Sequence, residues 1–201
     1  MEKLTSSLKN MLLSLALIST VVAGLLAFVY VLTKEPIEQA AKQKQENAIR
    51  EVTPDFNNNP AEEQFEIEIS NGDKLAVFPA RQDGKPVGIA VETNTQKGFS
   101  GEIKIMVGFD MNGMIKNYSV LKHAETPGLG SKMQEWFSDE SKPNQNVINR
   151  KWNASMKVKK DGGEIDAITA ATISSRAFMD ALNRAYEVYL KVKETNSETA
   201  E

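Results

Sequence analysis

Four hydroxyl side chains lie close together in the segment D-A-I-T-A-A-T-I-S-S, residues 166–175. They are Thr169, Thr172, Ser174 and Ser175. A catalytic hydroxyl nucleophile needs a neighbouring base. This segment contains no histidine, cysteine or lysine, and the chain has a single histidine, His123. The hydroxyls therefore either shape the backbone or carry a group that another protein attaches.

The same segment directly precedes an expected C-terminal helix. The amino end of a helix exposes free N–H groups and a partial positive charge, which together favour phosphate. A single hydroxyl at this place, Thr172 or Ser174, is equally well explained as an N-cap. Several hydroxyls among small alanines (Ala167, Ala170, Ala171) indicate instead an open surface for a larger group. The pattern leaves both interpretations open.

A second unusual stretch is H-A-E-T-P-G-L-G-S-K, residues 123–132, which follows an expected strand. Gly128 and Gly130 allow a positive φ or the close approach of a flat ligand to the backbone. A tight turn after a strand would explain the same residues. His123 and Glu125 by themselves do not indicate a catalytic base.

Alternation and turn residues predict the elements that must position these two stretches. Apolar residues at three- and four-residue steps from Ile173 to Val192 predict the C-terminal helix. Alternating apolar residues around Ile67 predict a half-buried strand. Asp-Gly at 83–84 and Asn-Gly at 112–113 predict two hairpins, and residues 152–160 are predicted to form a later strand.

The amino-terminal segment 11–32 carries no charge and is long enough to cross a hydrocarbon core of about 30 Å. A cleaved signal peptide has a shorter apolar run, so a membrane anchor is the preferred interpretation. Residues 35–52, with Pro36 near the first helical position, predict a second helix, either a stalk or a helix lying on the domain. Basic residues on both sides of the anchor leave its orientation open.

Composition excludes several classes of protein. The chain has 24 basic and 27 acidic residues, a net charge of −3, which gives no basic face for nucleic acid. It has no cysteine and one histidine, so a disulfide, thiolate or zinc site is not expected. No dinucleotide-binding motif follows a strand. The predicted fold class is α+β: a single N-terminal transmembrane helix, then a domain of antiparallel strands with a C-terminal helix.

Both stretches resemble motifs of the FMN-binding domain family shared by the G subunit of the Rnf electron-transport complex and the C subunit of the sodium-pumping NADH:quinone reductase. The segment T-A-A-T-I-S resembles the family's Ser/Thr-Gly-Ala-Thr motif, which implies that FMN is joined as a phosphoester to Thr172. The resemblance makes the remaining motif residues cofactor-binding as well: Thr169, Ala170, Ala171, Ile173 and Ser174. The E-T-P-G-L-G stretch matches the family loop next to the flavin: Glu125, Thr126, Pro127, Gly128, Leu129 and Gly130. Ala170 replaces the motif glycine, and if that position needs a positive φ the alanine is strained by about 1 kcal/mol or more.

The resemblance also implies a domain organisation. Residues 1–10 would form a cytoplasmic tail, 11–32 the transmembrane helix, 33–63 a stalk helix and linker, 64–193 the extracytoplasmic FMN-binding domain, and 194–201 a disordered tail. The protein would be a single-pass protein of the bacterial inner membrane.

The function implied is that of a membrane-anchored electron-transfer subunit with covalent FMN. Its Rnf-type complex would couple ferredoxin/NAD electron transfer to sodium or proton translocation. Its partners would be the other membrane and peripheral subunits, together with a flavin transferase for maturation. No catalytic acid, base or nucleophile, and no metal, is expected. The alternatives are the C subunit of the reductase, which is longer in that family, or a membrane-anchored assembly module without flavin.

Overall fold

The computed structural model describes residues 7–151 and 155–198 of the chain. Its elements are, in order, α1 (Leu8–Val52), β1 (Phe65–Glu68), β2 (Lys74–Gln82), β3 (Lys85–Gly98), β4 (Gly101–Asp110), β5 (Ile115–Lys122), η1 (Gly130–Lys132), α2 (Met133–Trp136), η2 (Lys159–Asp161) and α3 (Thr172–Glu198). The chain forms two compact units that divide between Gln43 and Lys44. The antiparallel sheet and the C-terminal helix confirm the predicted α+β class.

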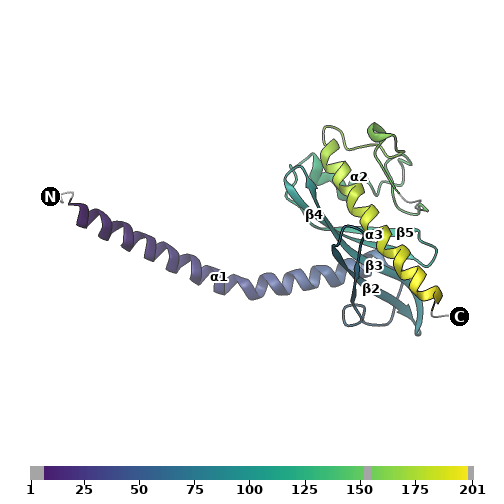
Figure 1. Cartoon of the computed structure of the whole chain (residues 1–201), viewed down its shortest axis with the longest axis horizontal. Coiled ribbons are helices and arrows are strands. Elements are labelled where there is room, and N and C mark those ends of the chain that lie inside the picture. The colour runs from purple at the N-terminus through teal and green to yellow at the C-terminus, as the bar shows by residue number, and fades with distance from the viewer. Residues whose placement is uncertain (1–6, 152–154, 199–201) are drawn as a thin grey trace. The chain divides into compact units, whose positions relative to one another are not determined.

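α1 joins the predicted membrane helix and the predicted second helix into one element. The predicted start of a separate helix near Pro36 is wrong, because Pro36 lies inside α1. An internal proline removes one backbone hydrogen bond and bends a helix. The surrounding residues have high helix propensity and continue it. Figure 1 shows that α1 changes direction in its middle without ending.

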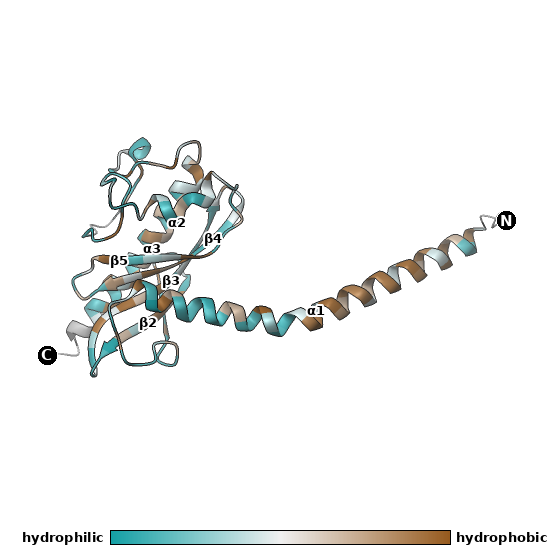
Figure 2. Cartoon of the chain, turned by 180° about the vertical axis from the view of Figure 1, so that it is seen from behind, coloured by the Kyte–Doolittle hydropathy of each residue, from teal (hydrophilic) through white to brown (hydrophobic). Residues whose placement is uncertain are grey.

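The first part of α1 is apolar and exposed. Large side chains such as Leu12, Leu25 and Phe28 are each more than half accessible, and Figure 2 shows this part of the helix in the hydrophobic colour. Among the described residues, α1 is the one helix long and apolar enough to cross a membrane by length and composition. It is therefore a candidate membrane span, in agreement with the sequence prediction.

Five strands form a single antiparallel sheet in the order β1-β2-β3-β4-β5, so each strand pairs with its neighbour in the sequence. Both predicted hairpins are confirmed. Asp83 and Gly84 have φ of 52° and 76°, and Gly113 has φ of 83°, the positive values that tight hairpin turns require. A further turn between Gly98 and Gly101 joins β3 to β4.

The strand predicted over residues 152–160 is wrong for its described part; residues 152–154 lie outside the described residues. Val158 forms an isolated bridge with Ile165, and η2 follows at once. The backbone before Val158 is satisfied by a side chain instead of a neighbouring strand. Asn183 of α3 accepts from the Met156 N–H at 2.8 Å and donates to the Met156 carbonyl at 3.0 Å. This contact joins residues 27 positions apart and takes the place of strand pairing at Met156.

Each face of the sheet is covered by one helix (Figure 1). α3 buries apolar residues such as Phe178 and Leu182 against Val91, Ile105 and Phe109 of β3 and β4.

The last turns of α1 bury their apolar side chains against the opposite face. The members of this cluster are Ala48, Ile49, Val52, Phe78, Ala90 and Met106. The sequence left two interpretations of residues 35–52 open, a stalk or a helix lying on the domain. The final turns of this helix lie on the domain.

α3 also extends further than the sequence predicts. Residues 194–198, predicted as part of a disordered tail, are helical as far as Glu198. No glycine or proline interrupts the helix in this part of the chain.

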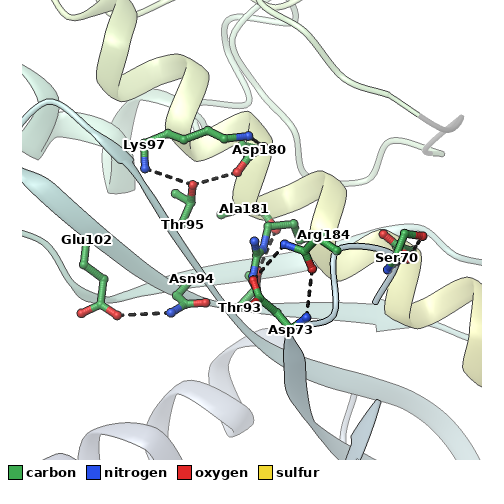
Figure 3. Close-up of polar contacts among 12 residues, drawn as sticks. Ser70, Asp73, Thr93, Asn94, Thr95, Lys97, Glu102, Asp180, Ala181 and Arg184 are labelled. Atoms are coloured by element: carbon green, nitrogen blue, oxygen red, sulfur yellow. Dashed lines mark hydrogen bonds and ion pairs between the residues drawn. The ribbon is translucent and has the colours of Figure 1, made fainter. Parts of the chain in front are cut away.

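Polar contacts fix the position of α3 along β3 (Figure 3). The buried Thr93 hydroxyl donates to the carbonyl of Ala181 at 3.1 Å, and the Thr95 hydroxyl donates to Asp180 at 2.7 Å. Lys97 forms an ion pair with the same Asp180 at 2.6 Å. Because these contacts are directional, they set the register of the helix and thereby the place where it begins.

The burial of the end of α1 gives a stability prediction. Ile49 is 2% exposed whereas Ile37, in the same helix, is 63% exposed. Ile49→Ala should lower the free energy of unfolding by about 2–4 kcal/mol, because it leaves a cavity. Ile37→Ala should change it by at most about 0.5 kcal/mol. Urea unfolding of the detergent-solubilised full-length protein, followed by tryptophan fluorescence, measures both, and equal effects would contradict the packing of the last turns of α1 on the sheet.

Candidate functional site

The buried carboxylate of Glu125, 4% exposed, connects three segments of the chain. Its Oε1 accepts from the backbone N–H of Ser100 at 3.0 Å, and its Oε2 accepts a short hydrogen bond from the hydroxyl of Ser174. A Cβ added to Gly98 or to Gly130 would lie 2.7 Å from one of these two oxygens. The carboxylate therefore holds the β3–β4 turn, the loop 125–130 and the first turn of α3 together.

A pocket of about 270 Å³ lies where these three segments meet. Its lining comprises Phe99, Thr126, Leu129, Gly130, Ala170, Ala171, Thr172, Ile173 and Ser174. Phe99 is 66% and Ile173 48% exposed. The pocket thus combines apolar side chains with small residues and hydroxyls, which suits a flat organic ligand that also carries polar groups.

Most of the predicted site residues come together in this pocket. Those that do not line it are Glu125, Pro127, Gly128 and Thr169. Glu125 acts from behind the lining, through the contacts described above. Gly128 has φ of 76° and belongs to a tight turn in which the Leu129 N–H donates to the Thr126 carbonyl at 3.1 Å.

The tight-turn interpretation of residues 123–132 is therefore confirmed, and the same loop also lines the pocket. Gly130 serves a different purpose from the one the sequence suggests. The space that a side chain on Gly130 would need is filled by Ser174 and Glu125. The glycine is thus required by packing within the protein.

Two of the four hydroxyls in the segment 166–175 are committed to internal hydrogen bonds. Ser174 is 2% exposed and donates to Glu125. Ser175 is 0% exposed; it donates to the Ala171 carbonyl and accepts from the Ile168 N–H, both at 2.9 Å. Ser174 thus ties the amino end of α3 to Glu125, and Ser175 ties it to the residues that directly precede the helix.

The other two hydroxyls are accessible. Thr169 is exposed and lies outside the pocket lining. Thr172, the first residue of α3, is half-buried, lines the pocket and accepts from the Lys160 ammonium at 3.1 Å. Of the four hydroxyls, only that of Thr172 both faces the pocket and is open to a second molecule.

The amino end of α3 makes this part of the site electropositive. The first hydrogen bond of the helix runs from the Ser175 N–H to the Ala171 carbonyl, at 3.0 Å. The N–H groups of Thr172, Ile173 and Ser174 precede it and have no acceptor within the helix. Together with the positive end of the helix dipole, they favour an anion beside Thr172.

Ala170 has φ of 61°, in the left-handed region. The motif that this segment resembles has glycine at that position. Since the φ of Ala170 is positive, the backbone strain expected for an alanine here is present. A Cβ in the left-handed region costs about 1–2 kcal/mol. The strain lies in the lining of the pocket, immediately before the helix.

Sequence reasoning missed two residues of the site. Phe99 lies between Gly98 and Gly101 in the β3–β4 turn, and an exposed aromatic residue in a glycine-flanked turn was a signal that could have identified it. Lys160 gave no such signal. Twelve positions separate it from Thr172, and their contact is made only by the fold.

Two family models match the chain. Residues 98–187 match the FMN-binding domain, and residues 1–52 match the RnfG N-terminal region. The β3–β4 turn, the loop 125–130 and the start of α3 all lie within the first match.

Curated relatives match over most of the chain. The G subunit of the ion-translocating oxidoreductase complex of Vibrio cholerae is 36% identical over 192 residues, which cover 92% of this chain and 90% of the relative. The proteins of the same name from Salmonella typhi and Escherichia coli K12 are 37% and 35% identical, each covering 86% of both chains. The amino-terminal match and the names of these relatives agree on the G subunit. This chain therefore belongs to the G-subunit family of ion-translocating oxidoreductase complexes, and its domain is an FMN-binding domain.

Proposed function

We propose that this chain carries FMN as a phosphoester on Thr172 and serves as a membrane-anchored electron carrier on the outer face of an Rnf-type complex. The relatives are subunits of an ion-translocating oxidoreductase complex, and the domain is FMN-binding, so an electron-transfer subunit is the role that both support. The observation that carries the attachment site is that Thr172 lines the pocket and is only half-buried, whereas its neighbours Ser174 and Ser175 are buried and bonded within the protein.

The pocket matches the two chemically different ends of FMN. Phe99, Leu129 and Ile173 offer apolar surface to an aromatic ring system, and the small residues Ala170 and Ala171 leave room for its flat face. The free N–H groups of α3 favour the phosphate. FMN, when bound, accepts and passes on electrons; the residues of this chain hold it in place and set its environment.

The size of the pocket supports a covalent attachment. Pockets that enclose a small-molecule ligand usually measure about 300–1,000 Å³, whereas this one measures about 270 Å³. It would cover part of FMN and leave the rest at the surface. A partly exposed cofactor is open to electron exchange with a partner, and an ester bond prevents the dissociation that such shallow binding would permit.

The proposed maturation needs partners that the chain itself does not supply. The segment 166–175 contains no base, so a separate flavin transferase would attach FMN to Thr172. The other membrane and peripheral subunits of the complex would deliver and receive electrons.

Thr172→Ala tests the attachment site. The variant should lose all covalent flavin when it is produced together with a flavin transferase, and its mass should fall by one FMN beyond the substitution. Thr172 is the first helical residue and is half-buried, so the domain should lose at most about 1 kcal/mol and still fold. Intact-protein mass spectrometry and in-gel flavin fluorescence measure the result.

Thr169→Ala is the matched control, because Thr169 is an exposed threonine of the same segment outside the pocket lining. It should keep its covalent flavin. Covalent FMN on Thr172→Ala would mean that the site is misassigned. A wild-type chain without flavin would favour the alternative role of an assembly module.

Ala170→Gly should stabilise the protein by about 0.5–1 kcal/mol, because it removes the strain of an alanine at φ of 61°. The control is Ala124→Gly, an exposed loop alanine without a positive φ, which should be neutral or destabilising through greater freedom of the unfolded chain. Urea unfolding of both variants measures the difference. A loss of stability in Ala170→Gly comparable to that in the control would contradict strain at this position.

The orientation in the membrane gives a further prediction. Residues 34–201 should lie outside the cytoplasm. A protease added to intact spheroplasts should digest this part of the chain, as detected with an antibody against the domain. A cytoplasmic protein serves as the control for intact cells. Protection of the domain until the cells are lysed would reverse the proposed orientation.

A further inference from the structure

We infer that Lys160 is a phosphate-binding residue of this site, the cation that pairs with the phosphate of the flavin on Thr172. The inference rests on the proposed attachment to Thr172. Its starting point is the 3.1 Å contact between Nζ of Lys160 and Oγ1 of Thr172. In the sequence, the charged residues nearest to Thr172 are Arg176 and Asp166. Lys160 lies further away and reaches Thr172 from a separate loop.

The loop that carries Lys160 is held firmly at its base. Val158 is 1% exposed and pairs with Ile165 in a parallel bridge, and the Lys159 N–H donates to the Ile165 carbonyl at 2.8 Å. Gly163 lies so close to this base that an added Cβ would be 1.9 Å from the Lys157 carbonyl. The backbone at Lys160 is therefore held in place, and from there its exposed side chain reaches Thr172.

Two cations near Lys160, Lys159 and Arg176, are each engaged in an ion pair. Lys159 pairs with Asp166 at 2.8 Å. Arg176 holds Asp161 with two bonds of 2.6 and 2.7 Å, and the hydrogen bond from Arg176 lowers the pKa of the Asp161 carboxyl. Within the part of the chain that the structure describes, Lys160 is in no ion pair. Its ammonium attracts the Asp161 carboxylate only through space and donates to Thr172, so it can still pair with an anion that joins the site later.

The contact with Lys160 suits both states of Thr172. In the unmodified chain the hydroxyl oxygen accepts from the ammonium, which leaves the O–H proton free to be removed. On attachment from FAD, a bond forms between Oγ1 and the FMN phosphorus and the phosphoanhydride bond breaks. AMP then leaves, and the hydroxyl proton passes to the transferase or to solvent. The phosphodiester keeps one negative charge, and an ammonium group close to Oγ1 is placed to donate to its free oxygens.

Lys160→Met tests this role, because methionine keeps an unbranched side chain and removes the charge. The full-length protein in detergent is incubated with flavin transferase and FAD, and covalent flavin is followed by gel fluorescence and intact mass. We expect attachment to be about fivefold slower than in the wild type, the size of effect that an exposed ion pair can give. In the loaded protein, the ³¹P resonance of the phosphodiester should shift relative to that of the wild type.

The matched control is Lys159→Met, which removes the same charge one residue away, from a lysine that pairs with Asp166. It should match the wild type in attachment rate and in ³¹P resonance, and Lys160→Arg should restore most of the rate. If the wild type takes up flavin and Lys160→Met equals it in both measurements, the role of Lys160 is wrong while the attachment to Thr172 stands. If the wild type takes up no flavin at all, the proposed attachment itself fails.

Discussion

The burial of the Glu125 carboxylate is the constraint on which the geometry of the site depends. A buried charge is tolerated only when hydrogen bonds replace its lost hydration. Here the donors come from the Ser100 N–H and the Ser174 hydroxyl, which belong to two different segments. Satisfying this one group therefore requires the β3–β4 turn, the loop 125–130 and the start of α3 to meet. The glycines at 98 and 130 lie against this carboxylate, and a side chain at 98 would also meet the Gly101 carbonyl and one at 130 the Ser174 hydroxyl.

The meeting of these segments creates a site with two unlike ends. The turn and the loop contribute Phe99 and Leu129, whose exposed apolar surface suits an aromatic ring. The start of α3 contributes unpaired N–H groups and, through a separate loop, the contact of Lys160 with Thr172. α3 can present its amino end here because polar contacts with β3 fix its register. The strained Ala170 lies between the two ends, and the stability of the sheet and α3 offsets the free energy of this strain.

Local sequence signals predicted much of the architecture correctly. The uncharged run, the two hairpin dipeptides and the helical periodicity after Ile173 each act over a few residues, so the candidate span, the antiparallel sheet and α3 were all predictable. The errors have both local and long-range causes. Pro36 bends α1 without ending it, Asn183 satisfies the backbone at Met156 in place of a strand, and α3 continues to Glu198. Of these, only the contact of Asn183 with Met156 involves a distant partner, about which local propensity carries no information.

The sequence by itself determined the class of the protein and the segments of its site, because the two motifs are contiguous and their residue types carry the chemistry. It could not rank the four hydroxyls by geometry, since a hydroxyl in a short segment looks the same whether it is buried or open. Only the tertiary structure decided that Ser174 and Ser175 are buried and bonded while the Thr172 hydroxyl is open to the pocket. It also decided that Gly130 makes room for Glu125, and that Phe99 and Lys160 belong to the site. These outcomes depend on which distant segments meet, and that is fixed by the packing of α3 on the sheet and by the bonds that a buried carboxylate requires.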